Sequence, residues 1–174
     1  MADADERGRS EAMKPSAETV REYLHYDPDT GVIRWRVSPS RNVRAGTIAG
    51  ADCEGYRLIR VGGGRFRAHH VAWVYMTGEW PPHQVDHRDM DRSNNRWANL
   101  RLATHSQNRA NTRKTKNHSG FKCVYWYPRT NRWRAGIGFG GKQKTIGYFK
   151  TAEEAHAAYC KEAERVWGEF ARGA

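Results

Sequence analysis

Residues 85–108, VDHRDMDRSNNRWANLRLATHSQN, combine an acid, a histidine and well-separated asparagines in one short stretch. An unperturbed imidazole titrates near neutral pH, which suits His87 to the role of a general base that takes a proton from water. Carboxylate and amide oxygens are preferred ligands of Mg²⁺, which suits Asp86 and Asn108 to a metal site. Asn99 would hydrogen-bond to the imidazole and fix which ring nitrogen faces the water. The stretch therefore predicts a site for phosphodiester hydrolysis.

The segments around these residues predict short elements that bring them together. The turn sequence GEWPP at residues 78–82 precedes a short strand at 84–85. Residues 93–95, SNN, predict a loop, because asparagine tolerates turn conformations, and we assign these asparagines to the turn and not to the site. A helix would follow the loop, carry Asn99 and end near Asn108.

This arrangement resembles the HNH endonuclease family, whose ββα-metal fold sets a strand histidine against a metal held by a strand acid and a helix residue. More narrowly, it resembles the phage homing endonucleases of that family that have an asparagine in place of the final histidine. The resemblance implies that Asp86 and Asn108 hold the metal. It also implies that His87 is the general base and Asn99 its orienting partner. His105 lies one helical turn before Asn108 and is the alternative last ligand.

The charge of the chain agrees with a nucleic-acid partner. Lys and Arg outnumber Asp and Glu by 30 to 19 over 174 residues, a formal net charge of +11. This charge favours a polyphosphate partner, although a basic balance alone also fits membranes or acidic proteins. No segment approaches the roughly 20 apolar residues that cross a bilayer, and no secretion signal opens the chain. We expect double-stranded DNA as the partner, no membrane, and a soluble cytoplasmic protein, in the host-cell cytoplasm if a phage encodes it.

The three cysteines, Cys53, Cys123 and Cys160, are scattered and form no CxxC pair. An odd, scattered set supports neither a disulfide framework nor a thiolate zinc site. We therefore expect no structural zinc and one divalent cation as cofactor, Mg²⁺ with Mn²⁺ as the alternative.

The amino-terminal half predicts a small assembly of helices and strands before the site. A run of three glycines at residues 62–64 turns the chain between two segments that alternate in the manner of strands. His69 and His70 follow, and we assign them to packing under a helix. In chain order we expect a disordered tail at 1–14, a helix at 16–24, strands at 32–37, 55–61 and 65–69, and a helix at 71–75.

The same half resembles the amino-terminal strands of the phage proteins, which lie on DNA. The resemblance rests on the order of YDP, GY, AHH and GEWP along residues 26–81. Arginines are frequent on these strands, and cations there suit phosphate contacts. The predicted DNA contacts of this half are Arg57, Arg65 and Arg67.

Residues 109–119, RANTRKTKNHS, are polar and basic without one acid. Such a composition predicts a linker and not a core element. Its cations can follow the phosphate backbone or enter a minor groove, gaining affinity by counterion release. The predicted contacts in the linker are Arg113, Lys114 and Lys116.

From Gly120 onward the pattern changes to three short strands and one helix. Apolar residues alternate with polar or small ones along residues 133–139, which predicts a strand with one buried face. Thr151 and Glu154 have capping-box spacing and open a helix whose apolar stripe would cover that face.

This last segment resembles the DNA-binding domain of plant ethylene-response factors, a three-stranded sheet that lies in the major groove. The resemblance rests on Val124, WRA at 133–135, IGYF at 146–149 and the helix that follows Thr151. The chain departs from the plant pattern at Cys123, which replaces a glycine, so the plant target preference does not transfer. By strand alternation, the predicted DNA contacts are Lys122, Tyr125, Tyr127, Arg132, Arg134, Lys142, Gln143 and Lys144.

Together these patterns predict an α+β chain in which antiparallel strands lead into a ββα-metal nuclease core, followed by a three-stranded antiparallel sheet packed on one helix. We expect a tail at 1–14, a nuclease domain at 15–108, a linker at 109–119 and a DNA-binding domain at 120–172. The predicted function is a site-specific DNA endonuclease of homing type, a monomer or weak homodimer, which nicks DNA or cuts both strands. The alternatives are a non-catalytic DNA-binding protein or regulator with a decayed nuclease fold, and an RNA-binding protein.

Overall fold

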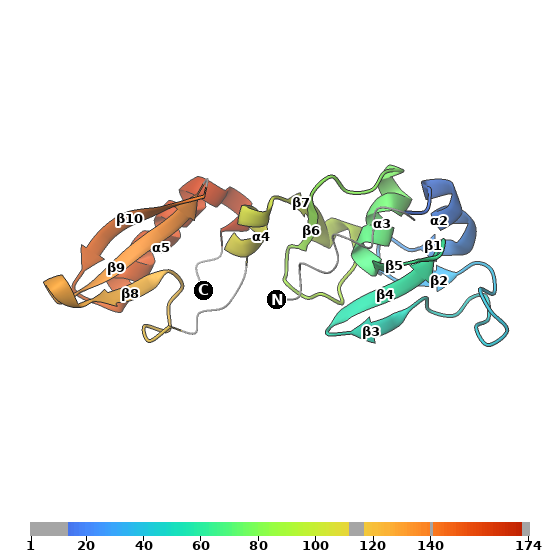
Figure 1. Cartoon of the computed structure of the whole chain (residues 1–174), viewed down its shortest axis with the longest axis horizontal. Coiled ribbons are helices and arrows are strands. Elements are labelled where there is room, and N and C mark those ends of the chain that lie inside the picture. Colours follow the sequence, from blue (N-terminus) through green and yellow to red (C-terminus); the bar gives the residue numbers. More distant parts are fainter. Residues whose placement is uncertain (1–13, 112–116, 140, 172–174) are drawn as a thin grey trace. The chain divides into compact units, whose positions relative to one another are not determined.

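The computed structural model describes residues 14–111, 117–139 and 141–171 (Figure 1). Internal contacts divide the chain into two compact units, Met1–Leu102 and Ala103–Ala174. We call them the first unit and the second unit. Each unit has its own cluster of buried apolar side chains.

The division between the units falls after Leu102, earlier than the expected end of the nuclease domain at Asn108. Some expectations concern residues outside the described ranges. These are the tail at residues 1–13 and the predicted DNA contacts Arg113, Lys114 and Lys116.

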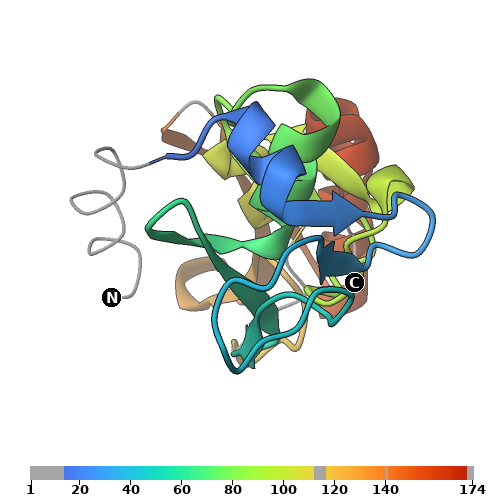
Figure 2. The same cartoon turned by 90° about the vertical axis from the view of Figure 1, so that its right-hand side faces the viewer.

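The first unit contains two helices that pack on each other (Figure 2). Helix α2, Ala17–Tyr23, is capped by Ser16, whose hydroxyl accepts a hydrogen bond from the Thr19 amide at 3.2 Å. Helix α3, Ala68–Thr77, ends at Gly78, which has a φ of 84°. Glycine adopts this left-handed conformation without strain and so terminates the helix.

Two antiparallel sheets accompany these helices. The strands are β1 (Leu24–Tyr26) paired with β2 (Ile33–Trp35), and β3 (Ala51–Cys53), β4 (Tyr56–Val61) and β5 (Gly64–Arg67) in that order. Val61 pairs with Gly64, so the glycine run makes a tight hairpin as predicted. Ile59, Val71 and Val74 are fully buried and join the sheet to α3 in one core.

The segment expected to form one helix through Asn99 and Asn108 is divided, so that expectation is wrong in part. The elements are strand β6 (Gln84–His87), a 3₁₀ turn η2 (Trp97–Asn99), strand β7 (Leu100–Ala103) and helix α4 (His105–Ala110). Strand β7 pairs with β6 and buries Leu100 and Ala103. Thr104 then starts α4 with a capping box. The chain order of β6, β7 and α4 is that of the expected strand–strand–helix core.

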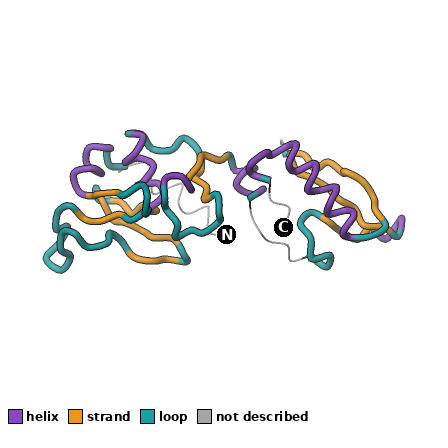
Figure 3. The backbone as a smooth tube through the Cα atoms, turned by 180° about the vertical axis from the view of Figure 1, so that it is seen from behind, coloured by secondary structure: helices purple, strands orange, loops and turns teal. Residues whose placement is uncertain are grey.

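The second unit contains a three-stranded antiparallel sheet covered by one helix (Figure 3). The sheet has the order β10 (Lys142–Phe149), β9 (Arg132–Phe139) and β8 (Val124–Tyr127), and the helix is α5 (Ala152–Trp167), with short 3₁₀ turns η3 (Pro128–Thr130) and η4 (Gly168–Phe170). Thr151 and Glu154 form the predicted capping box. Ala135 and Ile137 of β9 are buried under Tyr159 and other side chains of α5.

The α+β fold class and the carboxy-terminal sheet on one helix are therefore confirmed. In the part of the chain that the structure describes, no helix is long and apolar enough to span a membrane.

Candidate active site

His87 is the last residue of β6 and is 5% exposed. Its Nε2 lies 3.1 Å from Oδ1 of Asn95. An amide oxygen only accepts hydrogen bonds, so Nε2 carries the proton and, in the neutral ring, Nδ1 carries the lone pair. The contact thus fixes both the orientation of the ring and the nitrogen that is able to accept a proton.

Asn95 is held in place from several directions. The residue is 4% exposed, and its Nδ2 donates to the Ser93 carbonyl at 3.2 Å. Its own carbonyl accepts from the Tyr26 hydroxyl at 2.7 Å. The sequence interpretation assigned Asn95 to a turn, and the residue does lie in one, but its side chain also orients His87. Sequence reasoning missed this role because turn asparagines and ring-holding asparagines look alike in a single chain.

Asn99 braces the loop that follows His87. Its Oδ1 accepts from the Asp89 amide at 3.1 Å, and its Nδ2 donates to Asp89 Oδ1 at 2.9 Å and to the Asn94 carbonyl at 2.8 Å. The expected bond from Asn99 to the imidazole is thus replaced by bonds to the loop, and the structure places Asn95 on the ring instead. A positioning role for Asn99 through the loop stays a prediction.

Asp89 is the centre of this loop. Its carboxylate accepts from Asn99, from Nδ2 of Asn94 at 2.6 Å and from the Asp91 amide at 2.8 Å. Partial burial pushes the pKa of Asp89 up, but the hydrogen bonds from Asn99, Asn94 and Asp91 outweigh it and lower the pKa overall. The ionised carboxylate therefore ties both ends of the loop together at neutral pH.

Asp86 forms a buried ion pair with Arg101 across the β6–β7 hairpin. Asp86 Oδ2 lies 3.0 Å from Nε and 3.0 Å from Nη2 of Arg101, and the two side chains are 7% and 6% exposed. These two contacts fix the rotamer of the carboxylate. Sequence reasoning did not single out Arg101, because its partner lies on a neighbouring strand.

The predicted metal ligands belong to different units. Asp86 lies on β6, whereas Asn108 is half-buried on α4, and the alternative ligand His105 is exposed at the start of α4. Among the described residues, no group of three or more His, Cys, Asp or Glu side chains is placed to hold a metal by itself. The Asp86 carboxylate by itself offers few donor atoms, which fits a cation that keeps water and takes further oxygens from a substrate phosphate, as Mg²⁺ does.

His69 and His70 lie in the first turn of α3, and the His69 ring lies between those of His70 and His87. The His69 ring centroid is 4.9 Å from that of His87 and 4.5 Å from that of His70, both in edge-to-face geometry. Burial lowers the pKa of His69 well below its usual value and lowers the pKa of His70 to about 4. Both rings are therefore neutral at neutral pH, and His69 packs directly against the predicted general base.

The predicted DNA contacts of the first unit lie in different environments. Arg57 is half-buried and its Nη1 donates to the Gly50 carbonyl at 2.9 Å, which ties it to the backbone. Arg65 is exposed on β5. Arg67 is half-buried, with its guanidinium over the ring of Tyr56.

In the second unit, the strand register places several predicted contacts on one face of the sheet. Tyr125 pairs with Arg134, Tyr127 pairs with Arg132, and Gln143 pairs with Gly138. Tyr125 is 50% exposed. Residues opposite each other on antiparallel strands share a face, so these side chains lie on one face of the sheet, where Tyr127 and Arg134 are half-buried and the others exposed. We call this face the sheet face.

Two predicted lysines lie away from the sheet face. Lys144 pairs with buried Ile137, and its Nζ lies 3.2 Å from Oε1 of Glu162 on α5. Lys122 Nζ donates to the Ala110 carbonyl at 2.5 Å, and burial lowers the pKa of its amine. These two lysines thus support the unit internally.

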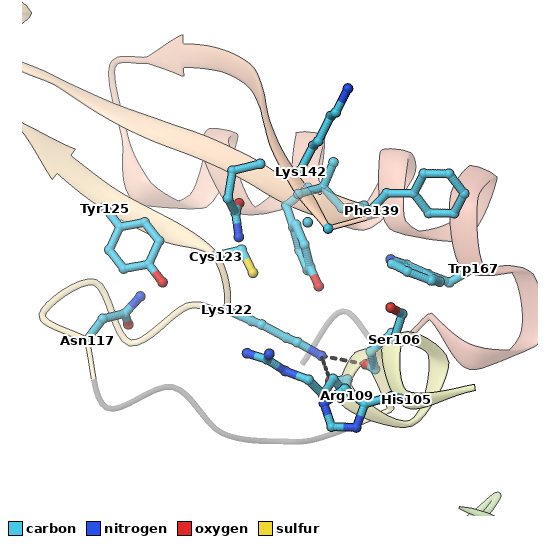
Figure 4. Close-up of a pocket in the computed structure, with 16 residues that line it drawn as sticks. His105, Ser106, Arg109, Asn117, Lys122, Cys123, Tyr125, Phe139, Lys142 and Trp167 are labelled. Atoms are coloured by element: carbon cyan, nitrogen blue, oxygen red, sulfur yellow. Dashed lines mark hydrogen bonds between the residues drawn. The ribbon is translucent and has the colours of Figure 1, made fainter. Parts of the chain in front are cut away.

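A cavity of about 570 Å³ lies within the second unit, beside Lys122 (Figure 4). Its walls include three cations, Arg109, Lys122 and Lys142, and no acid. Trp167 and Phe139 face it from α5 and β9 (Figure 4). The described lining of the cavity is therefore positively charged.

Comparison with known proteins shows that one segment of the chain matches a family. Residues 66–110 match the model of the HNH endonuclease family. That segment contains Asp86, His87, Asn95 and Asn99 together with the whole β6–β7 hairpin. The match ends at residue 110, so it leaves the resemblance of the carboxy-terminal segment to ethylene-response factors as a prediction.

A curated relative agrees with the family match. The chain is 36% identical over 87 residues to an uncharacterized HNH endonuclease of Acanthamoeba polyphaga mimivirus. The aligned part covers 50% of this chain and 44% of the relative, so the chain spans less than half of that protein's length. No solved structure matches the chain significantly. The chain therefore carries an HNH endonuclease domain around residues 66–110.

Proposed function

We propose that the protein is a metal-dependent DNA endonuclease of the homing type, which hydrolyses one phosphodiester per active site. The observation that carries the proposal is the buried contact between His87 and Asn95 inside the matched segment. An exposed histidine would have no fixed direction, whereas this ring presents Nδ1 as its proton acceptor.

In the proposed reaction, His87 Nδ1 takes a proton from water while the water oxygen bonds to phosphorus. The bond from phosphorus to the 3′ oxygen breaks, and that oxygen is protonated from solvent, which leaves a 3′-hydroxyl and a 5′-phosphate. Asp86 and Asn108 would hold the divalent cation, Mg²⁺ or Mn²⁺, which when bound supplies positive charge beside the departing oxygen. Arg101 holds the Asp86 carboxylate in one direction.

The second unit would select the DNA that is cut. Its sheet face presents Arg132, Arg134 and Gln143 with Tyr125 and Tyr127, a mixture that suits base edges and phosphates in a major groove. One active site per chain implies that a monomer nicks DNA, and a double-strand break would need a dimer or a second event. The alternative is a non-catalytic DNA-binding protein, in which the His87–Asn95 contact would be only structural.

Plasmid cleavage tests the proposal. Supercoiled DNA that includes the gene's own flanking sequence is incubated with Mg²⁺ or Mn²⁺ and with the wild type, His87→Ala or His83→Ala. His83 is exposed in the turn before β6 and serves as the matched control. We expect open circles or linear DNA from the wild type and His83→Ala, and none from His87→Ala. Wild-type protein that binds this DNA but cleaves none with either metal would refute the proposal and favour the non-catalytic alternative.

A further inference from the structure

Two arginines converge on one aromatic ring beside the candidate active site. The guanidinium carbon of Arg67 lies 4.5 Å from the ring centroid of Tyr56, and that of Arg92 lies 4.6 Å from it. The Tyr56 ring is itself 5.4 Å from the His69 ring and 6.4 Å from the His87 ring. We call Tyr56, Arg67 and Arg92 the arginine–tyrosine stack.

The backbone explains why Arg92 lies there. Glu54 and Gly55 connect β3 to β4 with φ values of 55° and 80°, so this two-residue turn is left-handed throughout. The turn directs the Glu54 carbonyl toward Arg92, whose Nη1 donates to it at 3.2 Å. Arg92 belongs to the loop that Asp89 ties down immediately after His87. Its guanidinium is therefore linked to the candidate general base through a short, braced segment.

Arg67 is the last residue of β5, the strand paired with the β4 strand of Tyr56. It pairs with Leu58 in the β4–β5 register, and Tyr56 is the next residue along β4 on the same face. Such diagonal neighbours are within reach of long and aromatic side chains. Arg67 also precedes α3, whose second residue is His69. Both arginines thus depend on elements that also position the histidine rings.

The arrangement brings two positive charges together next to a neutral histidine pair. Each guanidinium is attracted to the electron-rich ring, so the Tyr56 ring helps to fix the position of Arg92. Arg92 is exposed and uses Nη1 for its hydrogen bond, so Nε and Nη2 point to no other protein acceptor among the described residues. An anion beside Arg92 would receive charge-assisted hydrogen bonds from these donors.

We propose that the arginine–tyrosine stack is a binding site for a DNA backbone phosphate of the cleaved strand, within one nucleotide of the scissile bond. Tyr56 is the positioning residue, because its ring contacts both guanidiniums, and Arg92 contacts the phosphate. The inference rests on the proposed function. It assigns a role to Arg92, which no sequence motif singled out.

Neutral substitution of single phosphates tests the site directly. Duplexes that contain a methylphosphonate at each position around the mapped nick are compared for binding in EDTA and for cleavage with Mg²⁺. One substitution within a nucleotide of the nick should weaken binding by wild-type protein about tenfold, as loss of a charge-assisted contact predicts. Arg92→Ala should lose about as much on the unmodified duplex and little more on the modified one. Equal penalties for the methylphosphonate in wild type and Arg92→Ala would overturn the proposal.

Variants of the stack provide the matched controls. Arg92→Ala should lower kcat/KM by about 10- to 150-fold, the change that loss of a hydrogen bond to a charged group predicts. Arg60→Ala removes an exposed charge from the same strand as Tyr56 and should change kcat/KM less than threefold by comparison. An Arg92→Ala effect no larger than that of Arg60→Ala would also overturn the proposal.

Substitutions of Tyr56 separate positioning from packing. Tyr56→Phe keeps the aromatic face and should retain cleavage, whereas Tyr56→Leu fills similar space without it and should resemble Arg92→Ala. Equal activity of Tyr56→Leu and Tyr56→Phe would show that the ring only packs. If the wild type cleaves no DNA, the proposed function fails by itself. The stack is then judged by binding in EDTA, where Arg92→Ala must bind the flanking duplex more weakly than Arg60→Ala.

Discussion

The two units place their ionic groups in opposite environments. In the first unit, Asp86 and Arg101 are 7% and 6% exposed and form a pair inside the hairpin that carries His87. In the second unit, Glu162 contacts Arg165 and Lys144, two side chains that are each 67% exposed. The buried pair is held in one fixed geometry, as the proposed chemistry beside it requires, whereas water screens the exposed pairs.

The largest predicted difference is between the effects on unfolding of removing the buried and the exposed ion pair. Arg101→Ala leaves the Asp86 charge buried without its main partner, and we expect unfolding of the first unit to become about 3–5 kcal/mol easier. Arg165→Ala should change stability little, because water screens its pair with Glu162. Chemical denaturation monitored separately for each unit, by fluorescence or hydrogen exchange, makes the comparison.

A double substitution sharpens this test. Replacing the pair by Asp86→Leu with Arg101→Met removes both charges at similar volume and should recover most of the stability while abolishing cleavage. Equal changes in the free energy of unfolding for Arg101→Ala and Arg165→Ala would contradict the assigned difference between the two ion pairs.

The next largest effect should separate Asn95 from Asn99. Asn95→Ala removes the acceptor for His87 Nε2, and we expect cleavage to fall about 100-fold, as for other lost orienting contacts. Asn95→Asp keeps an acceptor oxygen and should recover most of that rate. Asn99→Ala is the comparison, because the Asn99 side chain braces the loop without contacting the ring. Single-turnover rates on the plasmid substrate provide the measurement, and an Asn95→Ala rate equal to that of Asn99→Ala would show that the ring contact matters no more than the bracing of the loop.

The sheet face of the second unit should affect binding and not the chemical step. Arg134→Ala should weaken binding of the target duplex by about 1–2 kcal/mol, near tenfold, the scale of one base or phosphate contact. The single-turnover rate at saturating protein should stay unchanged. Lys150→Ala removes an exposed charge just after β10 and is the control. A lower rate at saturation would show that the two units do not divide the work in this way.

The fold was more predictable than the contacts of the site. The hairpin at the glycine run and the Thr151 capping box have local causes, and both occur as expected. The helix expected through Asn99 was wrong because LRLA at 100–103 fits a helix or a strand, and only pairing with β6 decides between them. Such pairing depends on residues distant in the sequence.

The candidate site shows the same limit at the level of single side chains. The spacing of Asp86 and His87 within the motif located the site, but their partners Arg101 and Asn95 depend on how the hairpin and its loop fold. The stack on Tyr56 is less predictable still, because it joins β4, the start of α3 and the loop after β6. Local patterns therefore pointed to the segment that matches the family and to candidate residues within it, whereas tertiary contacts determine how those residues are arranged.

The smallest predicted effect is an acid sensitivity confined to the first unit. Burial, with Arg67 and Lys14 nearby, lowers the pKa of His70 in the folded protein from 6.5 to about 4, and His69 and His87 are its other titratable neighbours. The unfolded chain therefore gains a proton first as the pH falls. The stability that neutral His70 contributes is complete above pH 6.5 and is lost between pH 6.5 and pH 4, by about 1–2 kcal/mol since the side chain keeps some solvent contact.

Calorimetry between pH 7.5 and pH 4.5 measures this loss. We expect the unfolding temperature of the first unit to fall less in His70→Gln than in the wild type, because glutamine has no charge to gain. His83→Gln changes an exposed histidine of the same unit and should behave like the wild type. The second unit has no comparable pair of histidines with lowered pKa values among its described residues, so its transition should move less. A wild-type profile matched by His70→Gln would shift the cause of acid sensitivity to other groups of the first unit, with His69 the next to test.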